Sequence, residues 1–322
     1  MVSFSSEVKE EIGKNISPAR HCQIAELAAV LSACGRLKQN ENGEHFLHFQ
    51  TENEALARKC FTLLKKTFNI DVVMKTGKSP YLKKGNIYVI EVSDQEKVRK
   101  VLQGTKLVDE GSRMSELTMF SKPIVTQKVC CKRAFIRGAF LAAGSISDPE
   151  KGYHFEIVCA ERRKAEQIQG LIQCFDIDAK IVVRNKSHVV YVKEGAQIVE
   201  LLAVMEANVS LMNLENIRIV KEMRNSVNRK VNCETANIHK TVNAAVRQVE
   251  DIRLVEEKIG LENLNEGLAE IAELRLKYPE ATLKELGMML CPQVGKSGVN
   301  HRLRKLSELA KDLRRRKEEN LL

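Results

Sequence analysis

The stretch GAFLAAGSISD, residues 138–148, indicates an apolar helix that ends at a glycine. Its small side chains would let a second helix approach its backbone closely; these residues are Gly138, Ala139, Ala142 and Ala143. An enzyme that holds a metal at such a helix end would need a carboxylate just before Gly144, and the chain has Ala143 there. The stretch therefore favours either a nuclease that has lost its acid or a fold that never needed one.

A second helix of the same kind precedes this one, which indicates an internal duplication. The helix expected in IAELAAVLSACGRL (residues 24–37) ends at Gly35, and the helix expected in RAFIRGAFLAAGSI ends at Gly144. The two glycines are 109 residues apart (144 − 35). Turns of the form Phe-x-Ile-Asp begin at Phe68 and Phe175, an offset of 107 (175 − 68). Two offsets this similar, with the same order of elements, predict one unit that occurs twice.

Each copy has the order helix, strand, helix and hairpin. The strands HFLHF and YHFEIV alternate in character, which predicts one face on a core and one face toward water. The helices AERRKAEQIQGLIQCF and ENEALARKCFTLLKKTF hold equivalent places in the two copies. We expect a pseudo-twofold α+β domain with the two small-faced helices packed at its centre.

A polar helical segment follows, from about Leu214 to Gly260. It has apolar residues at helical spacing, no proline, and basic residues that include Arg229 and Lys230. Residues 228–237 are rich in asparagine, which favours caps and turns over helix interiors. This predicts a break between two helices, with a capping role and a DNA contact both open for the asparagines.

The last segment has the pattern of three short helices. The first carries an apolar side and ends at Pro279; that side consists of Leu264, Leu268, Ile271, Ala272 and Leu276. The second begins with Thr-Leu-Lys-Glu, a capping box with Thr282 as N-cap and Glu285 at the third helical position. It ends at Cys291-Pro292, and Ser297 is the expected N-cap of the third helix.

The third helix separates an apolar stripe from a polar surface. The stripe is Val299, Leu303, Leu306, Ala310 and Leu313. The other faces of its first turns carry Asn300, His301, Arg304 and Lys305. This is the layout of a helix-turn-helix, whose recognition helix enters the major groove by its N-terminal turns. A three-helix bundle that binds another protein is the alternative.

We predict double-stranded DNA as the partner of this segment, because Asn pairs with adenine and Arg with guanine. The predicted DNA-binding residues are Lys284, Lys296, Ser297, Gly298, Asn300, His301, Arg302, Arg304 and Lys305. Secondary contacts, or merely solvated turns, are predicted for Lys75, Lys78, Lys83, Lys84, Arg184, Lys186, Arg229 and Lys230. The tail that starts at Arg314 adds a nonspecific basic patch.

Composition agrees with this prediction without deciding it. The 322 residues carry a formal net charge of +10, which suits a polyanionic partner. Nine cysteines are scattered without a CxxC pair, and Cys130-Cys131 are adjacent, so we expect free thiols in a reducing cytosol and no metal or cofactor. The charged N-terminus excludes a signal peptide, and no apolar run is long enough for a membrane span. These patterns predict a cytoplasmic protein.

The duplicated, small-faced helices that end at glycines resemble those of LAGLIDADG homing endonucleases. The resemblance implies that the two helices cross at a pseudo-dyad and that two sheets form a saddle over DNA. It also implies an acid before each terminal glycine to bind the catalytic metal, and here those positions are Cys34 and Ala143. Neither binds magnesium well, since magnesium requires oxygen ligands. Asp148, in the context Asp-Pro-Glu-Lys-Gly, is expected to form a turn.

The whole chain also resembles the bacterial WhiA family of DNA-binding regulators. The resemblance rests on KELGMML and GKSGVNHRLRKLSELA in the last segment and NRKVNCETAN in the linker. It implies a non-catalytic transcription regulator, associated with the nucleoid and tied to cell division, chromosome segregation and, in sporulating relatives, sporulation. A metal-dependent nuclease that uses other acids, such as Asp148 or Glu156, and a protein-interaction scaffold are the alternatives.

The domain organisation follows from these patterns. We expect an N-terminal helix over residues 1–20 and the LAGLIDADG-like domain over 21–212, with repeats at about 21–103 and 130–205. A helical linker over 213–262 and a helix-turn-helix domain with a basic tail over 263–322 complete the chain. Because both repeats lie in one chain, we expect a monomer, with another regulatory protein as an open second partner.

Overall fold

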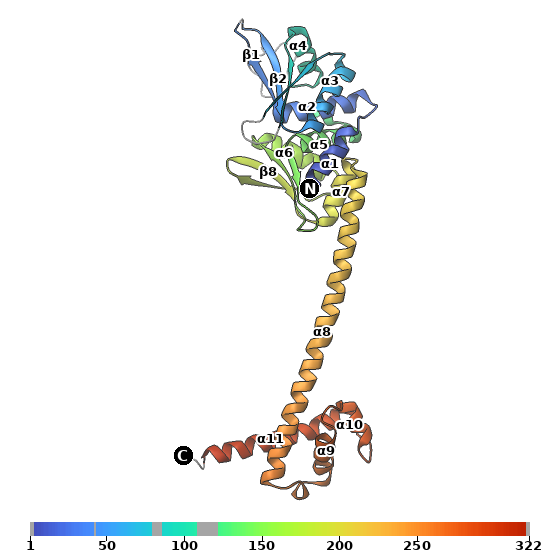
Figure 1. Cartoon of the computed structure of the whole chain (residues 1–322), viewed down its shortest axis with the longest axis vertical. Coiled ribbons are helices and arrows are strands. Elements are labelled where there is room, and N and C mark those ends of the chain that lie inside the picture. The colour runs from blue at the N-terminus through green and yellow to red at the C-terminus, as the bar shows by residue number, and fades with distance from the viewer. Residues whose placement is uncertain (1–2, 42, 79–85, 108–121, 320–322) are drawn as a thin grey trace. The chain divides into compact units, whose positions relative to one another are not determined.

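The computed structural model describes residues 3–41, 43–78, 86–107 and 122–319 (Figure 1). The chain divides into two compact units, Met1–Lys221 and Glu222–Leu322, and each has its own hydrophobic core. Within the described ranges, no helix combines the length and the apolar character that a bilayer crossing requires.

The first unit begins with α1 and then repeats one order of elements twice. Helix α1 spans Phe4–Lys14 and precedes the first copy. The first copy consists of α2 (Arg20–Cys34), β1 (Gly35–Gln39), β2 (His45–Thr51), α3 (Glu54–Phe68), β3 (Val73–Lys78), β4 (Asn86–Val92) and α4 (Gln95–Gly104). After η2 (Pro123–Thr126), the second copy consists of α5 (Val129–Ala143), β5 (Gly144–Ile146), β6 (Phe155–Cys159), α6 (Arg162–Gln173), β7 (Lys180–Arg184), β8 (Ser187–Val192) and α7 (Gly195–Val204). The predicted pseudo-twofold α+β architecture is confirmed.

Each copy contains two elements that the sequence patterns missed. The leading helices end at Gly35 and Gly144 as predicted, but a short strand that the sequence patterns did not indicate begins at each glycine. Both glycines have extended backbone, with φ −74° at Gly35 and −89° at Gly144. A closing helix, α4 or α7, follows each hairpin. Short strands and short amphipathic helices give weak periodic signals, which explains the omission.

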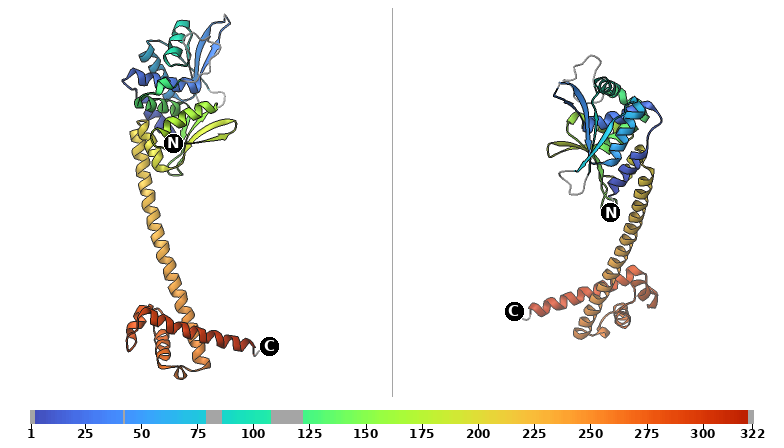
Figure 2. Two further views of the ribbon diagram at one scale, coloured as in Figure 1. Left: turned by 180° about the vertical axis from the view of Figure 1, so that it is seen from behind. Right: turned by 45° about the horizontal axis from the view of Figure 1, so that its top comes forward.

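The eight described strands form two antiparallel sheets of four. Their orders are β1-β2-β4-β3 and β5-β6-β8-β7, so the two copies have one topology. The strands that begin at the two glycines pair in the same way, with Gly35 opposite Phe49 and Gly144 opposite Ile157. Both sheets lie on the same side of this unit, and most of its helices lie on the other side (Figures 1 and 2).

Helices α2 and α5 form the centre of this unit, as predicted. Their apolar residues belong to one continuous core that extends through both copies. A Cβ atom added to Gly138 would lie 2.5 Å from the carbonyl oxygen of Glu26 and 3.1 Å from the Ala29 methyl carbon. The two backbones are therefore so close that only glycine fits at this position of α5.

Helix α8 (Asn208–Lys258) is continuous over 51 residues, and the predicted break within residues 228–237 is wrong. The asparagines Asn228, Asn232 and Asn237 are exposed, and the Asn237 carbonyl accepts a hydrogen bond from the Thr241 hydroxyl at 2.9 Å. Side chains that point into water compete little with the helix backbone, so the low helix propensity of Asn does not end the helix.

The second unit contains the end of α8 and four further elements: η3 (Leu261–Asn263), α9 (Glu266–Lys277), α10 (Leu283–Met289) and α11 (Lys296–Glu319). Its core combines residues from all the α-helices of this unit: Ile252, Leu268, Ile271, Ala272, Leu286, Leu290, Val299, Leu303 and Leu306. An ion pair between Arg314 and Asp251, 2.7 Å from Nη2 to Oδ1, ties α11 to the last turns of α8.

Candidate nucleic-acid interface

The predicted capping box at the start of α10 is confirmed. The Thr282 amide donates to Glu285 Oε2 at 2.7 Å, and the Glu285 amide donates to Thr282 Oγ1 at 3.3 Å. Two hydrogen bonds with Thr282 lower the pKa of the Glu285 carboxyl. The bond with the Thr282 backbone has the larger effect and the bond with its side chain the smaller one. This box fixes where α10 begins, so Lys284 projects from its first turn as an exposed residue.

The turn between α9 and α10 is organised by Arg275, which is 2% exposed. Its Nη1 atom donates to the carbonyl oxygens of Pro279 at 3.2 Å and Ala281 at 2.7 Å. Burial lowers the pKa of this guanidinium. Arg275 therefore replaces water as the partner of two turn carbonyls and sets the direction from α9 into α10.

The turn between α10 and α11 depends on Gly287. The Val294 amide donates to the Gly287 carbonyl at 3.0 Å. A Cβ atom at Gly287 would lie 2.1 Å from the Val294 carbonyl oxygen and 3.1 Å from a methyl carbon of Val299. The close packing of α10 against this turn and α11 therefore requires glycine here.

Helix α11 begins earlier than predicted. Ser297 was expected to be its N-cap, but the helix starts at Lys296, and Ser297 lies in its first turn. The Gly295 carbonyl accepts from the Val299 amide at 3.1 Å, so the capping position is Gly295. Glycine is acceptable at an N-cap, and the backbone of the preceding turn determines where the helix starts.

The apolar stripe of α11 is buried as predicted. Val299, Leu303, Leu306 and Ala310 are at most 1% exposed, and Leu313 is half-buried. The opposite side of the helix is exposed: Lys296, Ser297, Asn300, His301, Arg304 and Lys305. At about 100° per residue, these positions lie around the face opposite the stripe. We call this set, together with Lys284 of α10, the α11 face.

Arg302 lies between the stripe and the α11 face and contacts the protein. Its Nη1 atom donates to the Gly267 carbonyl at 3.2 Å, and its side chain is half-buried against the first turn of α9. A Cβ atom at Gly267 would lie 3.3 Å from the guanidinium carbon. Arg302 therefore links α11 to α9, while Arg304 points to water.

Arg304 is exposed and forms an ion pair within its own helix. Its Nε atom lies 3.1 Å from Glu308 Oε1, and the two side chains are 76% and 57% exposed. An exposed pair of residues four apart contributes only about 0.3–0.5 kcal/mol. Arg304 can therefore exchange this partner for another acceptor at little cost.

The basic residues predicted as secondary contacts have mixed surroundings. Lys75 pairs with Glu91 at 2.8 Å, and Arg184 pairs with Glu156 at 3.0 Å. Lys75 and Arg184 on the two sheets are therefore each already paired with a carboxylate of their own sheet. Exposed positions at the hairpin ends and on α8 are Lys78, Lys186, Arg229 and Lys230. The predicted contacts Lys83 and Lys84 lie outside the described residues.

Glu156 and Asp148, the alternative catalytic acids, are both engaged in structural contacts. Burial raises the pKa of Glu156, but hydrogen bonds from His154, Ser145 and Arg184 outweigh burial and lower it. Asp148 forms the predicted turn: its carbonyl accepts from the amides of Lys151 and Gly152, and its carboxylate accepts from the Glu150 amide at 3.0 Å.

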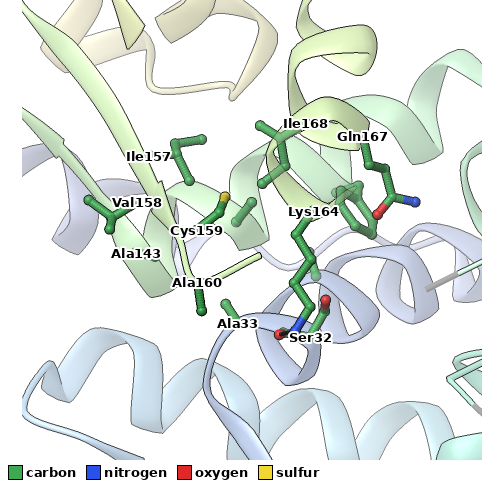
Figure 3. Close-up of a pocket in the computed structure, with 13 residues that line it drawn as sticks. Ser32, Ala33, Ala143, Ile157, Val158, Cys159, Ala160, Lys164, Gln167 and Ile168 are labelled. Atoms are coloured by element: carbon green, nitrogen blue, oxygen red, sulfur yellow. Dashed lines mark hydrogen bonds between the residues drawn. The ribbon is translucent and has the colours of Figure 1, made fainter. Parts of the chain in front are cut away.

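The ends of α2 and α5, where the resemblance to homing endonucleases implies metal-binding acids, have a different chemistry here. Burial raises the pKa of the Cys34 thiol to about 12, against the opposing effect of the nearby Lys9. Ala143 lines a cavity of about 40 Å³ together with Ala33 and the aliphatic residues of β6 (Figure 3). Polar residues also line this cavity, among them Gln167 and the cation Lys164, whose Nζ donates to the Ser32 carbonyl at 2.9 Å.

Comparisons with known proteins match all three parts of the chain. The "WhiA N-terminal LAGLIDADG-like domain" matches residues 20–108, the "WhiA LAGLIDADG-like domain" matches 132–224, and the "WhiA C-terminal HTH domain" matches 227–310. A solved structure, full-length DUF199/WhiA from Thermatoga maritima, is 26% identical with a TM-score of 0.58 and covers 97% of this chain and 99% of that one.

Curated relatives match over nearly the full length. The "Probable cell division protein WhiA" of Lachnoclostridium phytofermentans is 55% identical over 313 residues, which is 97% of this chain and 100% of the relative. Its counterpart from Clostridium botulinum is 48% identical over 97% of this chain and 99% of the relative. With its duplicated LAGLIDADG-like domain and C-terminal helix-turn-helix, the chain belongs to the WhiA family.

Proposed function

We propose that this protein is a DNA-binding transcription regulator that does not cleave DNA. The observation that carries the proposal is the α11 face. This face is exposed and basic, and it lies opposite the buried residues Val299, Leu303, Leu306 and Ala310, on a helix that packs against α9 and α10. A rigid helix with polar and basic residues in its first turns is the arrangement that reads the major groove.

In the proposed complex, the first turns of α11 contact base edges. Asn300 suits bidentate hydrogen bonds to adenine, and Arg304 suits bidentate hydrogen bonds to guanine. His301 lies beside them on the same face. Arg302 contributes by holding α11 against the Gly267 carbonyl, which preserves the angle at which the helix enters the groove.

Phosphate contacts come from the rim of this face. The first amides of α11 have no intrahelical acceptors and, with the helix dipole, favour an anion. Lys296, Ser297 and Gly298 lie in this turn, and Lys284 lies in the first turn of α10. The exposed Arg229 and Lys230 of α8, and the lysines and arginines of the two sheets, are proposed as weaker, nonspecific contacts.

The absence of cleavage is proposed from the chemistry at the ends of α2 and α5. Phosphodiester hydrolysis with one or two bound metals needs carboxylate ligands at the scissile bond. Here a neutral thiol (Cys34), an alanine (Ala143) and the Lys164 ammonium occupy the surroundings. Lys164 is already held by the Ser32 carbonyl and by Glu161 Oε1 at 3.0 Å, and a neutral thiol and a methyl group are poor ligands for Mg²⁺.

The cellular role is proposed from the relatives. Proteins up to 55% identical are named probable cell division proteins, so we propose that this regulator acts in cell division. Its resemblance to the family extends the proposal to chromosome segregation and, in sporulating relatives, to sporulation. We further propose a monomer in the cytoplasm, associated with the nucleoid and open to a second regulatory protein as partner.

The test is a pull-down of fragmented genomic DNA from the source bacterium by the purified full-length protein, with and without magnesium. The fragments are scored for enrichment by sequencing and for new strand ends. We expect enrichment of particular fragments and no magnesium-dependent strand ends. Magnesium-dependent cuts would overturn the non-catalytic proposal and favour the nuclease.

A matched pair of variants separates recognition by α11 from general charge. Asn300→Ala/Arg304→Ala should abolish the enrichment of particular fragments, while Lys311→Ala, an exposed basic residue farther along the same helix, should preserve it. No enrichment by the unmodified protein at any salt concentration would favour the protein-interaction scaffold instead.

A further inference from the structure

The N-terminal turns of α2 and α5 bring four metal-binding side chains to one point. His21 and Cys22 lie in the first turn of α2, and Cys130 and Cys131 lie in the first turn of α5. Their donor atoms all lie within 4.8 Å of one another. Adjacent pairs of this kind have no recognisable spacing in the sequence, so the cluster exists only because α2 packs against α5.

The four residues occupy equivalent positions in the two repeats. The sequence offset from His21 to Cys130 is 109 (130 − 21), and the offset from Cys22 to Cys131 is the same (131 − 22). Gly35 and Gly144, which follow the other ends of these helices, also have this offset (144 − 35). Each repeat therefore contributes the same two helix positions, and the cluster lies on the pseudo-twofold axis.

We propose that His21, Cys22, Cys130 and Cys131 bind one structural zinc ion that joins the two repeats. Three cysteines and one histidine are an established ligand set for structural zinc. Soft thiolate donors favour zinc and exclude the hard cations Mg²⁺ and Ca²⁺.

The spacing of the donor atoms fits a tetrahedral ion. His21 Nδ1 lies 3.2 Å from Cys131 Sγ, 3.3 Å from Cys22 Sγ and 4.0 Å from Cys130 Sγ. With zinc–sulfur bonds of about 2.3 Å and zinc–nitrogen bonds of about 2.0 Å, tetrahedral ligands lie about 3.5–3.8 Å apart. The four atoms need to move by only about 1 Å or less to reach this geometry.

Burial and charge around the cluster suit a bound ion. Cys22 and Cys131 are each 4% exposed, while His21 and Cys130 are exposed, so the cluster has a buried side and an open entry from solvent. Zinc with three thiolates and a neutral histidine carries one net negative charge. Two helix N-termini point at this position, and their dipoles stabilise a negative group.

The proposed ion would link α2 and α5 at their N-terminal ends. Cys34 and Ala143 lie at the C-terminal ends of the same helices. The metal of the related nucleases serves cleavage at those distant ends, whereas this ion would stabilise the crossing of the two helices. It would connect two segments that are far apart in the chain and thereby fix the relative position of the two sheets.

The test is a titration of reduced, metal-free full-length protein with Co²⁺, followed by displacement with Zn²⁺. We expect one Co²⁺ per chain with the visible absorption of a tetrahedral thiolate site and its loss on zinc addition. Elemental analysis of protein purified without chelator should find about one zinc per chain. No stoichiometric metal and no tetrahedral spectrum would overturn the proposal.

Variants at the exposed ligands avoid disturbance of the core. Cys130→Ser and His21→Ala should each weaken Co²⁺ binding by at least about 100-fold, more than loss of an outer-shell partner does. Cys233→Ser, an exposed cysteine on α8, should leave binding and spectrum unchanged. An unchanged spectrum in Cys130→Ser would overturn the site. The site would also be overturned if the purified protein contained a Cys22–Cys131 disulfide and bound no metal after that disulfide was reduced.

Discussion

Arg137 of α5 forms a bidentate ion pair with Glu26 of α2, 111 residues earlier, in the buried centre of the first unit. The Nε–Oε1 distance is 2.9 Å and the Nη2–Oε2 distance is 3.2 Å. Lys59 Nζ also lies 2.5 Å from Glu26 Oε1, and Glu206 Oε2 accepts from Arg137 Nη1 at 2.7 Å. Two cations and two carboxylates thus compensate one another between the repeats.

The four charges do not have equal roles. Glu26 is 0% exposed and contacts both cations, whereas the side chain of Glu206 is 43% exposed, pairs with Arg137 and also accepts from the Asn15 amide group. Burial lowers the pKa of Lys59, and this effect is opposed mainly by Glu26. Glu26 is therefore the group on which the neutrality of the cluster depends.

Glu26→Gln should lower the free energy of unfolding of the first unit by about 3–5 kcal/mol, because it leaves two buried cations with one partly exposed carboxylate. Arg137→Gln should cost less, since Lys59 still neutralises Glu26. Urea unfolding followed by circular dichroism measures both. Equal losses in the two variants would contradict the central role of Glu26.

Gly287→Ala should destabilise the second unit by about 1–3 kcal/mol, since the added methyl group forces α10 away from the Val294 carbonyl. The control is Gly170→Ala in α6, where an added Cβ meets no described atom within 4 Å. That change should stabilise its helix by about 0.5–1 kcal/mol. Thermal unfolding of the full chain compares them, and a neutral Gly287→Ala would refute the close packing.

Arg304→Ala should weaken specific DNA binding by about 1–3 kcal/mol, the range for one bidentate base contact. Binding is measured by fluorescence anisotropy on an enriched fragment and on a scrambled one, at several salt concentrations. Lys311→Ala is the control and should leave the preference between the two fragments intact. Unchanged affinity and preference in Arg304→Ala would remove Arg304 from the interface.

Acid should weaken the first unit partly through Glu156. Its folded pKa lies below the ordinary value of 4.5, so its contribution to stability is fully present above that pH and is lost as the pH falls through the folded pKa. Glu156→Gln should therefore flatten the decline of unfolding free energy in acid. Glu200→Gln, an exposed carboxylate on α7, is the comparison, and equal acid sensitivity in both variants and the unmodified protein would contradict this role.

Several parts of the fold follow from local sequence. The small residues before Gly144 and their repetition near Gly35 predict the paired central helices, because close helix packing requires small side chains. The Thr282–Glu285 capping box and the stripe from Val299 to Ala310 predict α10 and α11, since caps and 3.6-residue periodicity act within one helix. The exposed positions of Asn300, His301 and Arg304 follow from the same periodicity.

Other features depend on contacts between distant segments. The chain alone did not reveal that His21-Cys22 would meet Cys130-Cys131, that Glu26 would pair with Arg137, or that Arg302 would turn toward Gly267 while Arg304 faces water. Its local patterns also predicted the wrong start for α11 and a false break in α8. The physical reason is that propensity, capping and periodicity describe a residue's neighbours within about one helical turn. Ion pairs, donor clusters and side-chain direction are decided by which helices pack together, and only the tertiary structure contains that information.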